Sequence, residues 1–497
     1  MNSMNNHDQW TVSAELNSIS MRMRKTRNAR RAWAGIIGAS IYLSCVVLPS
    51  VWAGDLRVGR AEADITPPVG MPVGGLFYLR LSTGRHDDLH AKALVMEKDG
   101  VRVALVACDL IGVPARIARS ARQLIEKTSG LPGDRVMISG THTHTGPEMD
   151  PVILESAQKE TAKIIEEYFA TLPAKIAESV KLAEANLTPA RAWAAVGRED
   201  SLSFNRRFLM KDGTVRFNPG KLNPDIIRPV GPIDPDVAVV YFDSPDSQPL
   251  ATYVNFPMHL DTVGGMSFSA DYPLTLGKLL REVKGPQMLT VFTIGTAGNI
   301  NHLDVKSGAR QSGHEEAARI GMVLASEVLK TYARMKSPIT GPLKISREIV
   351  RLPVPELKPG DVERSRAVVE RSRQPGPGGP EFLETVRAFT VLHVGEFQGK
   401  PIEAEVQVIT LGDEIAWVGL PGEIFVELGK AIKLASPYPT TIICELANDS
   451  IDYVPNRKAF AEGAYEVVTA QCTPGSGEAL VEAATRLLVE AFHRNQK

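Results

Sequence analysis

Residues 135–147 read RVMISGTHTHTGP and contain the strongest local signal in the chain. Residues 135–139 predict a short buried strand, which runs directly into two histidines separated by one threonine. In extended chain, residues i and i+2 point to the same side, so His142 and His144 should face one common space. Two imidazoles there can offer one nitrogen to a metal ion and another to substrate or water. The motif is short, so an ordinary polar loop is the alternative interpretation.

Helix-like and strand-like patterns alternate on both sides of this stretch. Helical periodicity follows the strand at 101–107 and should end at Gly130, a residue type that favours helix ends. Short apolar runs between the helices suit interior strands. The predicted helices span residues 115–127, 155–184, 273–283 and 315–333, and the predicted strands span 101–107, 135–139, 237–242, 251–256 and 288–294.

The pattern becomes richer in strands after Pro342. Two of its predicted strands should form a hairpin that turns at Gly412-Asp413. The Pro- and Gly-rich residues 374–380 are expected to form a surface loop rather than a domain boundary. We expect an α/β fold, a mixed β-sheet core covered by helices in a single large catalytic domain over residues 54–497. The elements predicted in this half are strands 343–354 and 389–394, a hairpin of 403–411 and 416–420, and an amphipathic helix 478–492.

The N-terminus has the features of a secretory signal peptide over residues 1–53. Six basic residues precede an apolar stretch, which ends in Val51-Trp52-Ala53 before Gly54. This small-residue pattern predicts cleavage after Ala53 and a secreted or periplasmic protein. An uncleaved membrane anchor is the alternative, since the apolar run approaches the length that spans a bilayer.

Composition excludes several classes of protein. The 497 residues carry 56 basic and 57 acidic side chains, a net charge of -1, and 43% are hydrophobic. Such a balance provides no general attraction to nucleic acid, and the apolar content is too high for a disordered chain. Without residues 1–53 the charges become 50 basic and 55 acidic, and three cysteines remain. So few cysteines in a long chain make no disulfide framework.

Three further residues could join the two histidines, although each also has an ordinary structural interpretation. His259 follows an apolar strand in NFPMH, where a lone histidine is usually hydrogen-bonded structure. Glu423 follows another in GLPGE, where an acidic residue would also suit the first turn of a helix. Tyr453 could be a packed aromatic residue. None of these residues is convincing without the others.

Taken together and in order, these segments resemble the catalytic domain of the neutral, non-lysosomal ceramidases, which are zinc amidohydrolases that split ceramide. The landmarks extend over nearly all of residues 54–497, and an ordered set is more specific than any single motif. They are ADITPP at 63–68, His86, AKALV at 91–95, Asp109, the THTHTGP loop, Asn205-Arg206, FPMH at 256–259, LPGE at 420–423, and Tyr453 through Tyr465-Glu466.

The resemblance implies a role for each matching residue. One Zn²⁺ ion would be held by His142, His259, Glu423 and Tyr453, with His144 beside the water that the metal activates. Arg206 and Tyr465 would line the catalytic pocket. The implied reaction is hydrolysis of the amide bond of an N-acyl lipid such as ceramide. The implied partners are a small-molecule or lipid substrate, with peripheral membrane contact through that substrate and no nucleic acid; the oligomeric state stays open.

The chain departs from the family pattern in two places. The family has a pocket serine in a Gly-Asp-x-Ser-Pro-Asn segment, and Asn301 stands there in the matching GNINH at 298–302. A side-chain amide is not a nucleophile, so a mechanism through an acyl-serine intermediate is excluded at this position. Attack by a water molecule on the substrate is still possible. The neighbouring His302 is a candidate for substrate contact, and Asp271 either closes the pocket rim or caps the helix after it. The larger ceramidases add an immunoglobulin-like domain that we expect this chain to lack.

The sequence leaves two alternatives to an N-acyl lipid amidohydrolase open. The same zinc site could serve another amide or an ester, in which case a short polar pocket is expected instead of a long apolar one. A secreted binding protein without catalysis is the other alternative, suggested by the lost serine. The intact set of histidines, glutamate and tyrosine argues against it.

Overall fold

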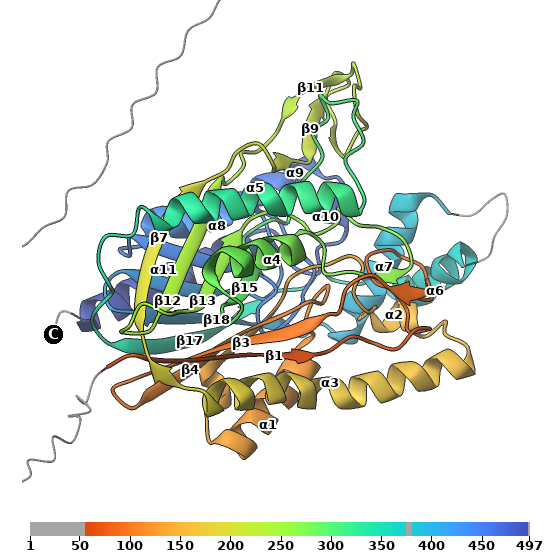
Figure 1. Cartoon of the computed structure of the whole chain (residues 1–497). Helices are drawn as coiled ribbons and strands as arrows, with labels where there is room; N and C mark the ends of the chain where they lie inside the picture. The colour runs from red at the N-terminus through yellow and green to blue at the C-terminus, as the bar shows by residue number, and fades with distance from the viewer. Residues whose placement is uncertain (1–54, 374–379, 496–497) are drawn as a thin grey trace, which may run out of the picture. The chain divides into compact units, whose positions relative to one another are not determined.

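Three β-sheets, each covered by a pair of helices, organise the chain in the computed structural model, which describes residues 55–373 and 380–495 (Figure 1). The predicted signal peptide and residues 374–379 of the predicted loop lie outside the described residues. The first sheet, in spatial order, consists of β5 (Val136–Gly140), β4 (Val101–Cys108), β3 (His90–Lys98), β1 (Arg57–Asp64) and β6 (Thr188–Pro189).

The other two large sheets each have four strands. The second consists of β15 (Leu289–Ile294), β13 (Pro249–Phe256), β12 (Asp236–Asp243) and β7 (Arg191–Arg198). The third consists of β17 (Leu343–Leu352), β18 (Ile402–Leu411), β19 (Ile415–Gly419) and β21 (Thr440–Cys444). Each of these sheets mixes antiparallel pairs with one parallel pair, as expected from the sequence.

The inner faces of the three sheets share one hydrophobic core. Alternate residues of a strand point to opposite faces, so Leu94 of β3 lies in this shared core while Ala93 faces the helices outside. Likewise Tyr253 of β13 and Trp417 of β19 are buried in the shared core, with their rings 6.1 Å apart. Strands that are apolar on both faces therefore fit between this core and the helices.

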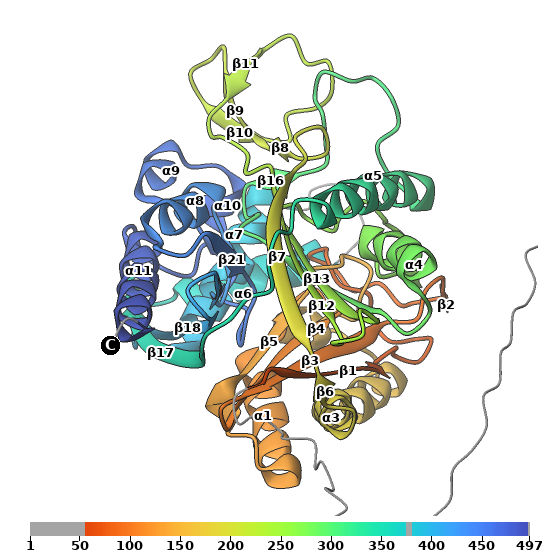
Figure 2. The same ribbon diagram turned by 60° about the vertical axis from the view of Figure 1, so that its left-hand side comes forward.

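The outer face of each sheet carries its own helices, as Figure 2 shows. The helix α1 (Ala115–Ser129) ends where the sequence predicts, because Gly130 adopts a left-handed φ of 70° and caps it. The covering pairs are α1 with α3 (Lys159–Ala185) on the first sheet, α4 (Tyr272–Lys284) with α5 (His314–Tyr332) on the second, and α8 (Val426–Ala435) with α11 (Ser476–Asn495) on the third.

One predicted strand is wrong. Residues 389–394 lie inside the helix α7 (Phe382–Glu396), which follows α6 (Asp361–Ser372). A short apolar run is compatible with either structure, and the helix is favoured because Val386, Phe389 and Leu392 recur at three-residue spacing and bury one face. That face packs against the short helix α2 (Pro151–Leu154).

The remaining elements are short. Among the helices described, none is long and apolar enough to span a bilayer. The three described cysteines, Cys108, Cys444 and Cys472, are buried and unpaired. The short elements are β2 (Gly84–Arg85), β8 (Phe204–Asn205), β9 (Arg207–Met210), β10 (Val215–Phe217), β11 (Ile226–Pro229), β14 (Ser267–Phe268), β16 (Ile300–Asn301), β20 (Glu423–Ile424), β22 (Tyr453–Val454), α9 (Arg457–Glu462), α10 (Tyr465–Val468) and the 3₁₀ helix Gly133–Arg135.

Candidate metal centre and pocket

The carboxyl ends of strands from all three sheets meet at one buried centre. His142 follows β5 of the first sheet, His259 follows β13 of the second, and Glu423 follows β19 of the third. Each of these strands belongs to a parallel pair, whose ends open on the same side. Tyr453 joins them because β22 pairs in parallel with β20, directly opposite Glu423.

The side chains at this centre are in mutual contact. Oε2 of Glu423 lies 3.1 Å from Nε2 of His259 and 3.4 Å from Nε2 of His142. The hydroxyl of Tyr453 lies 3.4 Å from Nε2 of His259. His144 contributes the third ring, with its Nε2 at 3.2 Å from Nε2 of His142. The structure thus brings together all four residues predicted as ligands and the histidine predicted beside them.

Backbone carbonyls orient two of these imidazoles. Nδ1 of His142 donates to the carbonyl of Ile111 at 2.7 Å, and Nδ1 of His259 donates to the carbonyl of Ala297 at 2.9 Å. With the proton on Nδ1, the lone pair of each Nε2 points into the centre, which is the usual arrangement of a metal-ligating histidine. His142 also has a left-handed φ of 75°, a conformation that non-glycine residues rarely adopt.

The Glu423 carboxylate supports a cation at this centre. Its Oε2 is buried without a hydrogen-bond donor, although two imidazole nitrogens approach it. Burial alone would raise the pKa of Glu423, but positive charge on His142 and His259 outweighs burial and holds the pKa well below its ordinary value. A divalent cation would supply this positive charge while both rings stay neutral. An ionised, buried and undonated carboxylate oxygen facing two nitrogen lone pairs fits a divalent metal, and imidazole with carboxylate is a set that zinc accepts.

His144 is a neutral imidazole next to this set. Burial, and then the proximity of His142, lower the pKa of His144 to about 3. The three rings of His142, His144 and His259 place their ligand atoms within 4.8 Å of one another. His144 is the least enclosed of the three, and it lines the open pocket. It is therefore the ring best placed to exchange a proton with a bound molecule.

Arg206 closes the other side of the centre and is held by a buried ion-pair network. Its Nη1 lies 3.2 Å from Nε2 of His259, and its Nε donates to Oε1 of Glu466 at 2.9 Å. The second oxygen of Glu466 accepts from Arg207 at 2.8 Å. The sequence does not predict this role of Glu466. The two consecutive arginines at 206 and 207 were the only hint of it, because two buried guanidinium groups need a carboxylate partner.

Both tyrosines are protonated in this environment. Burial raises the pKa of Tyr453 well above its ordinary value, more than Arg206 lowers it. Burial also raises the pKa of Tyr465, whose ring is stacked on Phe217 with centroids 4.5 Å apart. The guanidinium of Arg206 lies 5.3 Å from the Tyr453 ring and 5.9 Å from the Tyr465 ring. A phenolate at Tyr453 would need a metal's charge beside it.

A pocket of about 320 Å³ opens onto this centre. It has an apolar wall that includes Leu76, Phe77, Ile153 and Phe389, and a polar wall contributed by the same α2 and α7 region. In the polar wall, Nε2 of His393 lies 3.0 Å from Oδ1 of Asp150. His393 has no predicted role, because the segment that carries it reads as a strand in the sequence. Other polar residues that line the pocket are Arg116, Glu148, Thr390, Glu396, Ser450, Asp452, Thr469 and Gln471.

Arg206, which was expected to line the pocket, and three predicted substrate contacts are not among the residues that line it. The side-chain nitrogen of Asn301 donates to Oδ1 of Asn218 at 3.1 Å, and its Oδ1 accepts from the Leu303 amide at 3.2 Å. His302 places its two ring nitrogens at 2.9 Å from Asp261 and 2.7 Å from the Gln311 carbonyl. Asp271 is the N-cap of α4 and accepts from the Tyr272 amide at 2.7 Å. Of the two roles open to Asp271, the structure shows the cap.

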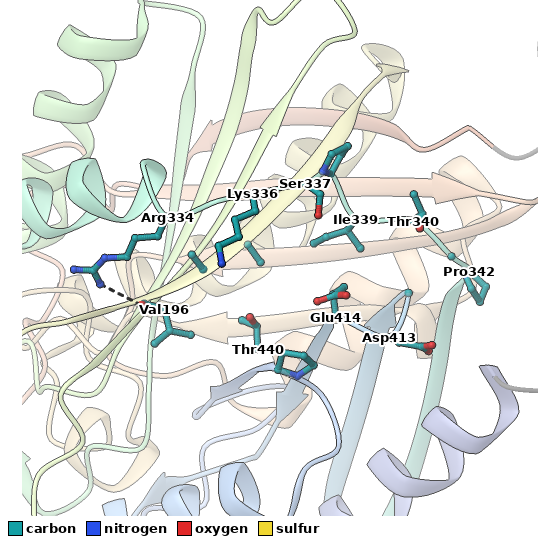
Figure 3. Close-up of a pocket in the computed structure, with 16 residues that line it drawn as sticks. Val196, Arg334, Lys336, Ser337, Ile339, Thr340, Pro342, Asp413, Glu414 and Thr440 are labelled. Carbon is teal, nitrogen blue, oxygen red and sulfur yellow. Dashed lines mark hydrogen bonds between the residues drawn. The ribbon is translucent and has the colours of Figure 1, made fainter.

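A larger pocket lies away from this centre, where the loop after α5 passes the turn between β18 and β19 (Figure 3). Its volume is about 740 Å³, and none of its lining residues is a histidine or cysteine. Arg334 donates to the Val196 carbonyl at its edge, at 3.4 Å. Neither of the two described groups that could hold a metal ion lies among its lining residues.

Comparisons with known proteins identify relatives by sequence and by fold. No protein-family model matches the chain. It is 24% identical over 411 residues to the curated neutral ceramidase of Pseudomonas aeruginosa, covering 74% of this chain and 58% of that relative. The chain thus spans less than two thirds of that relative's length.

Two solved structures share the fold. A crystal structure of neutral ceramidase from Pseudomonas aeruginosa matches with a TM-score of 0.69 and 20% identity, over 89% of this chain and 75% of that chain. A ceramidase complexed with C2 matches with a TM-score of 0.67 and 21% identity, over 89% and 76%. By sequence and by fold, the chain is similar to neutral ceramidases.

Proposed function

We propose that this protein is a zinc-dependent amidohydrolase that cleaves the amide bond of an N-acyl lipid, with ceramide as the first substrate to test. The observation that carries the proposal is the buried Oε2 of Glu423, which has no donor and faces Nε2 of both His142 and His259. These three residues and Tyr453 would hold the ion. When bound, zinc would polarise the amide carbonyl and lower the pKa of a water molecule.

The protein's own groups supply the rest of the chemistry. His144 is neutral and lines the pocket, so it can take a proton from the attacking water as the new C–O bond forms. The same proton can pass to the nitrogen as the C–N bond breaks, which releases an amine and a fatty acid. Tyr465 lines the pocket and is placed to donate a hydrogen bond to the oxygen that becomes negative, and one such donor is worth ~3 to 4 kcal/mol. The nitrogens of Arg206 already contact Glu466, His259 and the Gly298 carbonyl, so its part is to hold His259 in place.

An apolar rim supports a lipid substrate. We define the rim as Leu76, Tyr78, Phe382 and Leu383, whose exposed fractions are 40%, 56%, 50% and 43%. It continues into the pocket, because Leu76 and Phe77 line the wall and the Phe77 ring lies 6.1 Å from the Phe382 ring. Exposed apolar side chains gathered at a pocket mouth favour binding from a micelle or membrane surface.

A second candidate function is hydrolysis of an amide or ester with a polar group in place of one acyl chain. The polar wall favours it. Burial, and then Asp150, raise the pKa of Glu148 to about 8, and its Oε2 has no hydrogen-bond partner. A protonated carboxyl with a free oxygen can bind a hydroxyl or amide group of a substrate.

Turnover of a fluorescent ceramide and of short N-acyl amides, with and without 1,10-phenanthroline, tests the proposal. We expect ceramide cleavage that the chelator abolishes and added Zn²⁺ restores. Activity that resists the chelator would contradict the zinc mechanism. Cleavage of short amides without ceramide would favour the second candidate.

We also propose that the protein is exported to the periplasm or secreted, because residues 1–53 have the composition of a signal peptide. Mass spectrometry of the protein from its own host should find a mature N-terminus at Gly54. A chain that retains its first 53 residues in a membrane fraction would support the anchor instead.

A further inference from the structure

A second histidine cluster lies apart from the pocket just described. His86 follows β2, Asp87 is its neighbour, and His314 is the first residue of α5. Each of the three offers one ligand atom, and these atoms lie within 4.8 Å of one another. None of the three lines the pocket at the candidate metal centre. The cluster therefore lies outside the site of the function proposed above.

The carboxylate of Asp87 is fixed in place. Its Oδ2 accepts hydrogen bonds from the hydroxyl of Ser269 and from the amide of Ala270. Its Oδ1 lies 2.7 Å from Nδ1 of His86. The amides of His86 and Asp87 both donate to the carbonyl of Phe268, at 2.9 and 3.2 Å, so the backbone here is held as well. Asp87 is 7% exposed, whereas the side chain of His86 is 48% exposed.

This arrangement prepares His86 to bind a cation. With Nδ1–H donating to a carboxylate, the ring is held in one orientation and the lone pair of Nε2 is free, as in carboxylate–histidine–metal sites. The His314 ring stacks on His86 with centroids 3.6 Å apart and planes 12° apart. Among the described residues, its nitrogens have no hydrogen-bond partner. Burial, and then His86, lower the pKa of His314, so this ring is neutral and able to act as a ligand.

We propose that His86, Asp87 and His314 form a second, surface-accessible site for a divalent transition metal. Neutral imidazoles suit Zn²⁺, Ni²⁺, Co²⁺ and Cu²⁺. Two ligands of one such ion lie at most ~4.2 Å apart, since each bond is ~2.1 Å. To bind one ion, the exposed rings of His86 and His314 must therefore rotate out of their stack. Asp87 would keep its position and supply the negative charge, and water would complete the coordination. The N-terminus of α5 opposes a cation, and the Asp87 charge offsets this.

A metal at this site would join two distant parts of the chain. It would link the segment after β2 to the start of α5, which otherwise meet through stacked rings. Ser269, which holds Asp87, also accepts hydrogen bonds at its carbonyl from the hydroxyls of Thr143 at 2.7 Å and Thr145 at 3.2 Å. These threonines flank His144. The site would thus brace the far side of the loop that carries His142 and His144.

Nickel binding to the full-length protein tests this site. Protein dialysed to one equivalent of Zn²⁺ would be titrated with Ni²⁺ by calorimetry. The proteins compared are the wild type, His86→Ala, His314→Ala and the control His493→Ala, an exposed histidine on α11. We expect the wild type and the control to bind one further equivalent, and each cluster variant to bind it at least tenfold more weakly. Equal affinity in all four proteins would overturn the proposal.

A measurement on the wild type covers the case in which a variant fails to fold. Paramagnetic Ni²⁺ should broaden the ring-proton signals of His86 and His314 at a lower concentration than the signal of His493. Uniform broadening of the exposed histidines would contradict a built site. Neither readout uses ceramide turnover, so failure here is distinguishable from failure of the proposed function.

Discussion

Oε2 of Glu423 lies 3.1 Å from Nε2 of His259 but accepts no hydrogen bond from that ring, whose Nδ1 donates to the carbonyl of Ala297. An acceptor therefore faces an acceptor inside the protein. Such a contact is unfavourable unless a cation lies between the two atoms or a proton moves. The contact between Glu423 and His259 therefore indicates that a cation belongs at this centre.

The substitution Glu423→Gln should remove the metal from the buried centre. It keeps the shape of the side chain but removes the charge that balances the ion. Altered outer-shell groups already cost about 10- to 100-fold in metal affinity or activity, so loss of a ligand should cost at least ~100-fold in turnover. Zinc measured after dialysis should fall with the activity. The exposed Glu490→Gln should change neither, and an active, zinc-free Glu423→Gln protein would contradict the assignment.

His144→Ala should separate metal binding from catalysis. His144 contacts His142 but lines the pocket and is not needed to complete a set of four ligands. We expect the variant to keep its zinc and to lose ~10²- to 10⁴-fold in kcat, the usual contribution of a proton-transferring group. His142→Ala is the matched comparison and should lose zinc as well. Zinc loss in both variants would make His144 a ligand.

Glu466→Gln should destabilise the fold strongly. The carboxylate is fully buried and binds both Arg206 and Arg207, so its loss leaves two buried guanidinium groups with one less anion. Breaking such a network typically costs ~3 to 5 kcal/mol of the free energy of unfolding. Urea denaturation measures this. The more exposed Glu462→Gln, which also removes a partner of Arg207, should cost less than ~1 kcal/mol.

His393 should make stability fall at alkaline pH. Burial lowers its pKa, but Asp150 outweighs burial and raises the pKa to about 9, above the ~6.5 of an unfolded histidine. A raised pKa stabilises the fold fully below ~6.5, and this contribution disappears as the pH rises through 9. The wild type should exceed His393→Gln by up to ~3 kcal/mol at pH 6 and by almost nothing at pH 10. An NMR titration that places the His393 pKa near 6.5 would contradict this.

The apolar rim should matter for lipid surfaces only, if the proposed function holds. Burying one large apolar side chain is worth ~1.5 to 3 kcal/mol, so partial insertion of Phe382 and Leu383 should be worth at least tenfold in apparent affinity. The double variant Phe382→Ser and Leu383→Ser should raise the KM for ceramide in vesicles and leave that for a soluble short-chain analogue unchanged. Leu434→Ser, at a 90% exposed position on α8, is the control.

Several elements could be predicted because their signals are local. The strand before His142, the helix that ends at Gly130 and the hairpin at Gly412-Asp413 follow from apolar spacing and turn residues. The apolar run at 389–394 could not be assigned in this way, since its length suits a strand or a buried helix. Packing against α2 decided for the helix, and with it the position of His393 in the pocket wall.

The candidate site shows the same division. Local pattern predicts that His142 and His144 face one space, and the family resemblance predicts their partners. The two rings do meet, but not through extended chain, because His142 has a left-handed φ of 75°. Only the tertiary structure decided that three sheets end at one point, that Glu466 holds Arg206, and that Asn301 and His302 stay outside the pocket wall. The reason is physical: hydrogen bonds between residues adjacent in the chain follow from local conformation, whereas contacts across hundreds of residues depend on how the sheets bury their shared core.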